Sequence, residues 1–170
     1  RTDKEITLDE GPYRLVLASR AFHWMDQYPL LNKLSRITER GGGVALIGDG
    51  SFWTGSEPWQ KSIKEVIQDF LGQQRKAGKG KFSVSNEPYV DMLRKTGFNE
   101  VQARELLINR EWNIQEIIGC LYSTSFASPA LFGDRKEEFE NVLTDTLIAE
   151  NDGQETFREI AKFDLQLGKI

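Results

Sequence analysis

Two short apolar segments on either side of one amphipathic segment constrain the fold more than any other feature of the sequence. Residues 13–18 (YRLVLA) and 44–47 (VALI) are largely apolar and partly β-branched, which is typical of strands buried on both faces. The apolar residues between them recur at helical spacing: Leu30, Leu31, Leu34 and Ile37. Gly41, Gly42 and Gly43 are predicted to end this helix. Two strands joined by a helix form a right-handed crossover, so we expect the strands to be parallel.

The residues that follow the two strands are the first candidates for a site. In open α/β sheets, ligands bind at the carboxyl edge of the strands. At that edge the sequence places Ser19, Arg20, Phe22, His23 and Trp24 after the first strand, and residues 49–53 after the second.

The rest of the chain continues the alternation of helices and strands. Apolar spacing predicts helices over residues 59–74, 86–96, 114–121 and 135–149, the third capped by Asn113 and the last by Asp134. Strands are predicted over 98–107, with a polar and edge-like pattern, and over 157–167. The predicted fold class is therefore α/β.

Composition restricts the classes of partner. With 39% hydrophobic and 28% charged residues, the chain has the balance of a globular domain. Its net charge is −4 and its one basic stretch, residues 75–81, is interrupted by glycines, so we expect no nucleic-acid or membrane partner. Cys120 is the only cysteine, which excludes a disulfide framework within the chain and a four-cysteine zinc site. No apolar run approaches the roughly 18 residues of a membrane span, so we expect a cytoplasmic protein.

These residues carry a family resemblance. The run YRLVLASRAFHWMD, the helix that ends with Arg36 and the run RGGGVALIGDG resemble the middle of class I S-adenosylmethionine-dependent methyltransferases. The tetrapeptide AFHW is typical of the type-11, or trans-aconitate-methyltransferase-like, group. Further matches are GF before a strand, EW before a helix, and LYSTS. The resemblance covers nearly the whole chain but only the second half of the family's domain.

The resemblance implies a specific sheet. The family's strand order is three-two-one-four-five-seven-six with the seventh antiparallel, and this chain would supply strands four to seven in one domain over residues 1–170. We therefore expect a partial Rossmann-like sheet with helices on both faces. Strand four would expose the edge that strand one normally covers, so the resemblance predicts a homodimer or swapped oligomer through Tyr13–Ser19.

The implied cofactor is S-adenosylmethionine, but half of its usual site is missing from the sequence. The family binds this donor mainly through a glycine-rich turn after strand one, and no G-x-G-x-x-G pattern occurs here. What remains is the strand-four side: Ala18, Ser19, Arg20 and His23. Because the chain also begins at Arg1 in a polar run without Met, we expect a carboxyl-terminal fragment that is inactive alone.

Two roles are open for the histidine and the aromatic residues. Histidine has an ordinary pKa near neutrality, so His23, the only histidine, is a candidate general base for an acceptor hydroxyl or carboxyl, or it lines the pocket. Trp24, Trp53 and Tyr122 are the candidates for binding a small-molecule acceptor. Alternatively, the aromatic residues, including Phe52 and Trp59, pack in the hydrophobic core. The hydroxyl residues after Tyr122 alternatively cap the end of a helix.

Two functions follow. The first is a methyltransferase for a small molecule, present as its second half. The alternative is a non-catalytic α/β module that binds a partner through the exposed strand edge. A hydrolase is less favoured, because the sequence has no nucleophile elbow.

Overall fold

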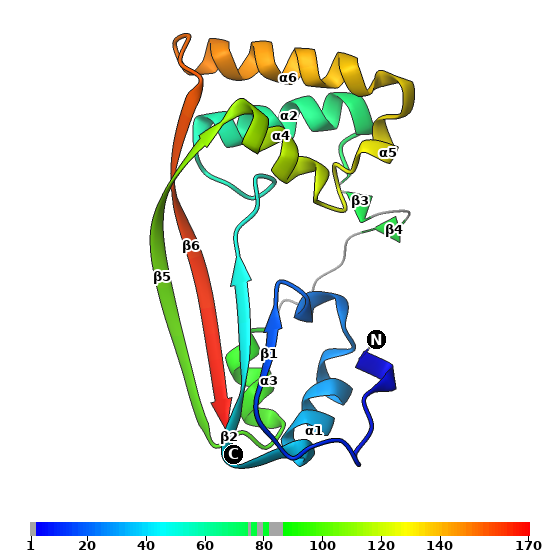
Figure 1. The fold of residues 1–170 in the computed structure, drawn as a ribbon, viewed down its shortest axis with the longest axis vertical. Helices are drawn as coiled ribbons and strands as arrows, with labels where there is room; N and C mark the ends of the chain where they lie inside the picture. The colour runs from blue at the N-terminus through cyan, green and yellow to red at the C-terminus, as the bar shows by residue number, and fades with distance from the viewer. Residues whose placement is uncertain (1–2, 75, 78–79, 82–86) are drawn as a thin grey trace. The chain divides into compact units, whose positions relative to one another are not determined.

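The computed structural model describes residues 3–74, 76–77, 80–81 and 87–170 (Figure 1). The strands are β1 (Tyr13–Ser19), β2 (Thr38–Asp49), β3 (Lys76–Ala77), β4 (Gly80–Lys81), β5 (Glu100–Asn113) and β6 (Thr156–Lys169). The α-helices are α1 (Gln27–Ile37), α2 (Pro58–Leu71), α3 (Tyr89–Lys95), α4 (Ile114–Tyr122), α5 (Pro129–Phe132) and α6 (Lys136–Glu150). Short 3-10 turns are η1 (Asp3–Glu5), η2 (Phe22–Trp24) and η3 (Gly133–Arg135). The predicted basic stretch at 75–81 and the helix start at Asn86 lie wholly or partly outside the described residues.

Four strands form one mixed sheet in the order β1-β2-β6-β5 (Figure 1). β1 and β2 are parallel, with Val16 opposite Val44, and β2 and β6 are antiparallel, with Ala45 opposite Leu167. This is the order four-five-seven-six with an antiparallel last strand. The predicted α/β fold class, the parallel crossover and the edge position of β5 are therefore confirmed.

The chain divides into two compact units. Unit 1 contains Arg1–Asp49, Val84–Leu107 and Lys162–Ile170, and unit 2 contains Gly50–Ser83 and Ile108–Ala161. β5 and β6 each contribute residues to both units.

The core of unit 1 forms where α1 and α3 pack against one face of the sheet. Its buried side chains are Phe22, Leu30, Leu31, Leu34, Ile37, Val44, Leu46, Met92, Leu93 and Phe98, with Val16 and Ala18 partly buried against them. Strand residues that alternate with these point to the opposite face. On that opposite face of β1, Leu15 and Leu17 are exposed.

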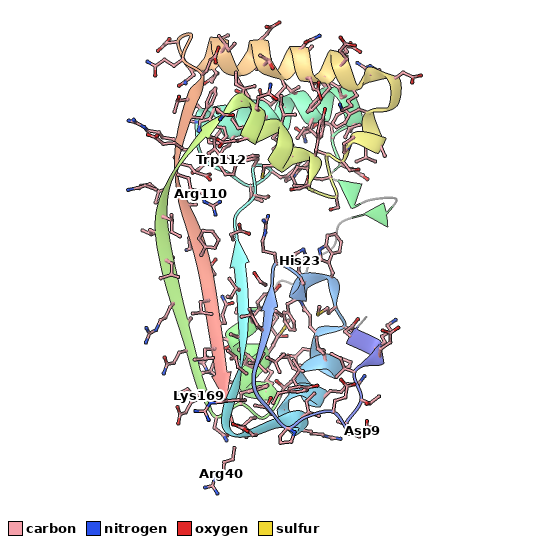
Figure 2. All side chains as sticks on the ribbon, in the orientation of Figure 1. Asp9, His23, Arg40, Arg110, Trp112 and Lys169 are labelled. Atoms are coloured by element: carbon pink, nitrogen blue, oxygen red, sulfur yellow. The ribbon has the colours of Figure 1, made fainter. Side chains whose placement is uncertain are left out.

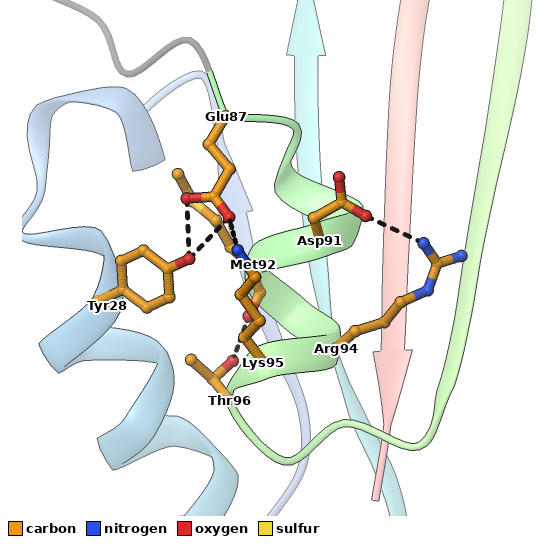
Figure 3. Close-up of polar contacts among 7 residues, drawn as sticks. All are labelled: Tyr28, Glu87, Asp91, Met92, Arg94, Lys95 and Thr96. Atoms are coloured by element: carbon orange, nitrogen blue, oxygen red, sulfur yellow. Dashed lines mark hydrogen bonds and ion pairs between the residues drawn. The ribbon is translucent and has the colours of Figure 1, made fainter.

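A polar cluster joins α1 to the segment that carries α3 (Figure 3). The Tyr28 hydroxyl donates to the Glu87 carboxylate at 2.8 Å, and Lys95 Nζ lies 2.7 Å from the same carboxylate. The hydrogen bond from Lys95 lowers the pKa of Glu87. The hydrogen bond that the Tyr28 hydroxyl donates to Glu87 raises the pKa of Tyr28. The carboxylate therefore remains ionised where it holds the two elements together.

The three glycines after α1 do not end the helix, and this prediction is wrong. α1 ends at Ile37, Thr38 is extended, and Gly41, Gly42 and Gly43 lie inside β2. A Cβ atom on Gly42 would lie 2.7 Å from the Arg14 carbonyl oxygen, and one on Gly43 would lie 2.7 Å from that of Gly168. These glycines permit close approach of the neighbouring strands.

The core of unit 2 is rich in aromatic residues. It is built by α2, α4, α5, α6 and the start of β6 around Ile63, Ile117, Leu121, Phe139, Leu143, Leu147 and Phe157. Asn113 and Glu116 form the predicted capping box at the start of α4, each side chain accepting the other residue's backbone N–H at 2.9 Å. Phe132 and Phe139 stack with their ring centroids 4.0 Å apart, which joins α5 to α6.

Several predicted boundaries shift. α2 ends at Leu71 because Gly72 takes a positive φ of 88°, which stops the helix earlier than predicted. Asp134 lies in η3, and Arg135 takes the capping position of α6. β5 extends from Glu100 to Asn113, because pairing within the sheet continues beyond the stretch that its own residues favour.

No helix within the described residues combines the length and apolar character needed to cross a membrane.

Candidate functional site

The carboxyl ends of β1 and β2 are tied together by one residue, Arg20. Its backbone N–H donates to the Ile47 carbonyl at 2.8 Å, and its Nε lies 2.8 Å from Asp49 Oδ1. Asp49 is the last residue of β2, and its side chain is mostly buried. An ion pair therefore sits at the sheet edge where α/β proteins bind ligands.

The turn η2, which follows Arg20 closely in the sequence, contains His23 and Trp24. Phe22 is buried in the unit 1 core and meets the Tyr89 ring edge to face, with the centroids 4.9 Å apart. Because Phe22 anchors the turn, the two following side chains are displaced from the core, and Trp24 is 53% exposed. Figure 2 shows His23 near the end of β1. The centroids of the His23 and Trp24 rings lie 4.9 Å apart.

The predicted strand-four residues do not all face the same way. Ala18 is partly buried against the unit 1 core together with Val16, whereas Ser19 is exposed opposite Ile47. Ser19, Arg20, His23 and Trp24 thus have their side chains at the edge, and Ala18 can offer only its backbone.

Two predicted acceptor residues, Trp53 and Tyr122, belong to unit 2. Trp53 packs edge to face against Phe126 at 5.5 Å, with Lys64 Nζ 5.8 Å from the centre of its ring. The Tyr122 hydroxyl donates to Glu140 Oε1 at 2.8 Å. Burial and this bond raise the pKa of Tyr122, so its phenol remains a proton donor at neutral pH.

Other aromatic and hydroxyl residues considered for the acceptor site instead pack in the core or cap a helix end. Phe52 and Trp59 are buried and meet edge to face at 5.3 Å. The hydroxyls of Ser123 and Thr124 donate to carbonyls in the last turn of α4, at 2.6 and 2.7 Å. These residues stabilise unit 2.

Asp49 is a site residue that the sequence analysis did not single out. It stood in the predicted loop of residues 49–53, although the apolar run GVALIG before it carries a usable signal. A carboxylate directly after a buried strand lies at the ligand-binding edge of a parallel sheet. Its partner Arg20 directly follows the neighbouring strand β1, and the separate strand patterns do not indicate this pairing.

Unit 2 also contains a surface cavity of about 370 Å³, lined by Glu57, Pro58, Trp59, Glu150, Asn151, Gln154, Thr156 and Arg158. Its polar groups already make contacts with the protein: the Trp59 indole donates to the Arg158 carbonyl at 3.2 Å, and Arg158 Nε lies 2.7 Å from Glu111. We therefore place the candidate site at the β1–β2 edge.

The edge provides a guanidinium, an imidazole and an exposed indole. Such a set can bind an anion, accept a proton and cover an apolar group. Among the described residues, no group of three or more His, Cys, Asp and Glu side chains is placed to hold a metal ion.

Comparison with known proteins supports the fold. No family model matches the chain, and no curated protein matches it. Similar solved structures include a protein provisionally described as a type II methyltransferase from Anaeromyxobacter dehalogenans, with a TM-score of 0.52 and 17% identity over 91% of this chain and 62% of that one. Another, from Bacillus halodurans and provisionally described as a methyltransferase, has a TM-score of 0.50 and 12% identity over 99% and 75%. YcgJ from Bacillus subtilis has a TM-score of 0.50 and 13% identity over 99% and 69%.

The chain therefore spans between three fifths and three quarters of these similar structures. At such low identity, the likeness shows a shared Rossmann-like α/β fold and leaves the chemistry to the residues of the site.

Proposed function

We propose that this chain forms the strand-four-to-seven part of an S-adenosylmethionine-dependent methyltransferase that acts on a small molecule. The observation that carries the proposal is the strand order β1-β2-β6-β5 with an antiparallel β6. Two of the three similar structures are provisionally described as methyltransferases, which agrees with the proposal.

The residues of this chain can form only one side of a site for the methyl donor. S-adenosylmethionine supplies the methyl carbon and the sulfur leaving group when it is bound, so the protein mainly has to bind and align. Ser19, Arg20 and His23 at the β1 edge can contact it, but the sequence has no glycine-rich turn to hold its nucleoside part. We propose that residues outside this 170-residue sequence complete the donor site, and that the chain alone is inactive.

His23 is the proposed base. Its imidazole lies in the turn directly after β1 and beside the exposed Trp24 ring. It would accept the proton from a hydroxyl or carboxyl of the acceptor, and Trp24 would cover the acceptor's apolar part. Trp53 and Tyr122 remain proposed acceptor residues from unit 2.

Calorimetric titration with S-adenosylhomocysteine tests this function. The 170-residue chain should give no measurable heat, because it lacks the glycine-rich turn, whereas the product of the complete reading frame should bind. His23→Gln in the complete product should lower methyl transfer by about a hundredfold or more, a larger factor than its loss of S-adenosylhomocysteine affinity, because glutamine can replace a hydrogen bond of the imidazole but cannot act as a base. Absence of binding by both polypeptides would remove the methyltransferase proposal.

The exposed edge of β1 favours a second candidate function, a partner-binding module. Leu15 and Leu17 are 59% and 58% exposed on one face of β1, and in the described sheet β1 is an edge strand. Apolar edge strands pair readily with other chains. We propose that Tyr13–Ser19 pairs with a second copy as a homodimer or swapped oligomer.

Light scattering after size-exclusion chromatography tests this pairing. Leu17→Glu should weaken dimerisation at least about tenfold, since it places a charge where about 1.5–3 kcal/mol of apolar burial is expected. Leu8→Glu is the control, because Leu8 is similarly exposed but lies outside the strands. A chain that stays monomeric at high concentration would rule out the pairing.

A further inference from the structure

Arg20 has an unusual backbone for its residue type. Its φ is +53°, in the left-handed region that favours glycine. A non-glycine residue there is strained, and such residues persist where the surroundings hold them in place. Here the backbone hydrogen bond to Ile47 and the ion pair with Asp49 provide that hold.

The guanidinium of Arg20 is fixed on one side and open on the other. Asp49 takes the Nε side, and its carboxylate is only 12% exposed. The Arg20 side chain is 57% exposed, and among the described residues the structure shows no partner for its two Nη groups. A guanidinium held in this way presents a planar, pre-oriented pair of N–H donors.

The charges around the pair favour one class of anion. Arg20 and Asp49 neutralise each other, and His23 is the only other basic side chain in residues 19–26. A phosphate places up to two negative charges on one group and would need more positive charge beside it than this. A single carboxylate can bridge the two Nη groups while Asp49 remains in place. Asp26 follows η2 at the start of α1, and its backbone N–H donates to Asp3 Oδ2 at 3.0 Å.

We propose that Arg20, oriented by Asp49, binds the carboxylate of a small-molecule ligand at the β1 edge. Arg20 contacts the ligand, and Asp49 is a positioning residue. That this ligand takes part in methyl transfer rests on the proposed function, but the binding itself requires no donor and can be measured separately.

The chain's only histidine provides the measurement. The imidazole resonances of His23 in NMR spectra are unambiguous and report on the loop that begins at Arg20. Succinate should shift them in a saturable manner, and succinamide, which has the same size and no charge, should not. Arg20→Gln should weaken succinate binding at least about tenfold, because it removes a charged bidentate donor.

Arg14 offers a matched control. Like Arg20 it is an exposed arginine in an ion pair, with Glu39 at 3.6 Å, but it lies in β1 near the amino end of the strand, whereas Arg20 directly follows the carboxyl end. Arg14→Gln should leave succinate affinity unchanged. Equal weakening by both substitutions, or binding of succinamide as tightly as succinate, would overturn the proposal.

A second variant separates binding from folding. Arg20→Gly relieves the left-handed backbone, so the thermal midpoint should stay the same or rise while succinate binding is lost. Asp49→Asn retains an oxygen acceptor for Arg20 Nε and should bind more tightly than Asp49→Ala, in which the Arg20 Nε–H resonance should be lost by exchange with water. Full succinate affinity in Arg20→Gly would overturn the proposal.

The carboxylate could belong to the methyl donor or to the acceptor, and competition in the product of the complete reading frame, which is expected to bind S-adenosylhomocysteine, distinguishes them. S-adenosylhomocysteine that displaces succinate would assign Arg20 to the aminoacyl carboxylate of the donor. Succinate that remains bound at saturating S-adenosylhomocysteine would assign it to an acidic acceptor. If the donor fails to bind at all, succinate binding still tests Arg20 by itself.

Discussion

Replacing Phe139 with alanine is expected to lower the free energy of unfolding by about 3–5 kcal/mol. Phe139 is fully buried in α6, stacks on Phe132 and meets Phe70 edge to face at 5.5 Å. Truncation removes both ring contacts and leaves a cavity between α2, α5 and α6 that the surrounding helices can fill only in part. Urea unfolding followed by circular dichroism measures the change.

Two variants make this prediction specific. Phe139→Leu should cost less, because it fills most of the same volume. Val142→Ala lies one turn further along α6 at an exposed position, so it should change the free energy of unfolding by no more than about 0.5 kcal/mol. A small effect of Phe139→Ala would mean that this aromatic cluster does not form the unit 2 core.

Replacing Gly43 with alanine is expected to lower the free energy of unfolding by about 1–3 kcal/mol. The new Cβ atom would meet the Gly168 carbonyl oxygen at 2.7 Å, and this oxygen belongs to the backbone of β6, which cannot rotate away. The strands β2 and β6 must separate locally to relieve the clash. The midpoint of urea unfolding should therefore fall.

Gly48 in the same strand gives the opposite expectation. A Cβ atom there has no neighbour within 4 Å, although Gly48 also pairs with β6, opposite Asp164. Gly48→Ala should leave stability unchanged or raise it by about 0.4–1 kcal/mol, because alanine restricts the unfolded chain. Equal effects at both positions would contradict the close-approach explanation.

The sequence alone predicted much of the architecture. Short apolar runs and helical spacing gave the strands β1, β2, β5 and β6 and the helices α1 to α4 and α6, since these patterns follow from the geometry of single elements. The resemblance added the order of the strands, which the structure confirms. The boundaries were less accurate, because strand pairing extended β5 and a positive φ at Gly72 shortened α2.

The glycines show why local patterns were not sufficient. Glycine after a helical pattern usually marks the end of the helix, but Gly42 and Gly43 are in β2 because the backbones of Arg14 and Gly168 approach them. A glycine that ends a helix and a glycine that permits close approach of strands are identical in the sequence. Only the partner strand distinguishes them.

The candidate site was predicted in part. The run from Ser19 to Trp24 was located correctly at the end of β1, since the edge position follows from the strand itself. The side chains of Trp53 and Tyr122 instead make contacts within unit 2, with Phe126 and Glu140, and their proposed role towards the acceptor is still to be tested.

The amino-acid sequence by itself determined which segments form helices and strands and which residues stand at the end of β1, because periodicity and chain order are local properties. The tertiary structure decided which side chains meet. It brought Asp49 to Arg20 across two strands, held Arg20 in a left-handed backbone and left Leu15 and Leu17 exposed. Each of these depends on a neighbour that is distant in the sequence, and such neighbours are fixed only when the sheet forms.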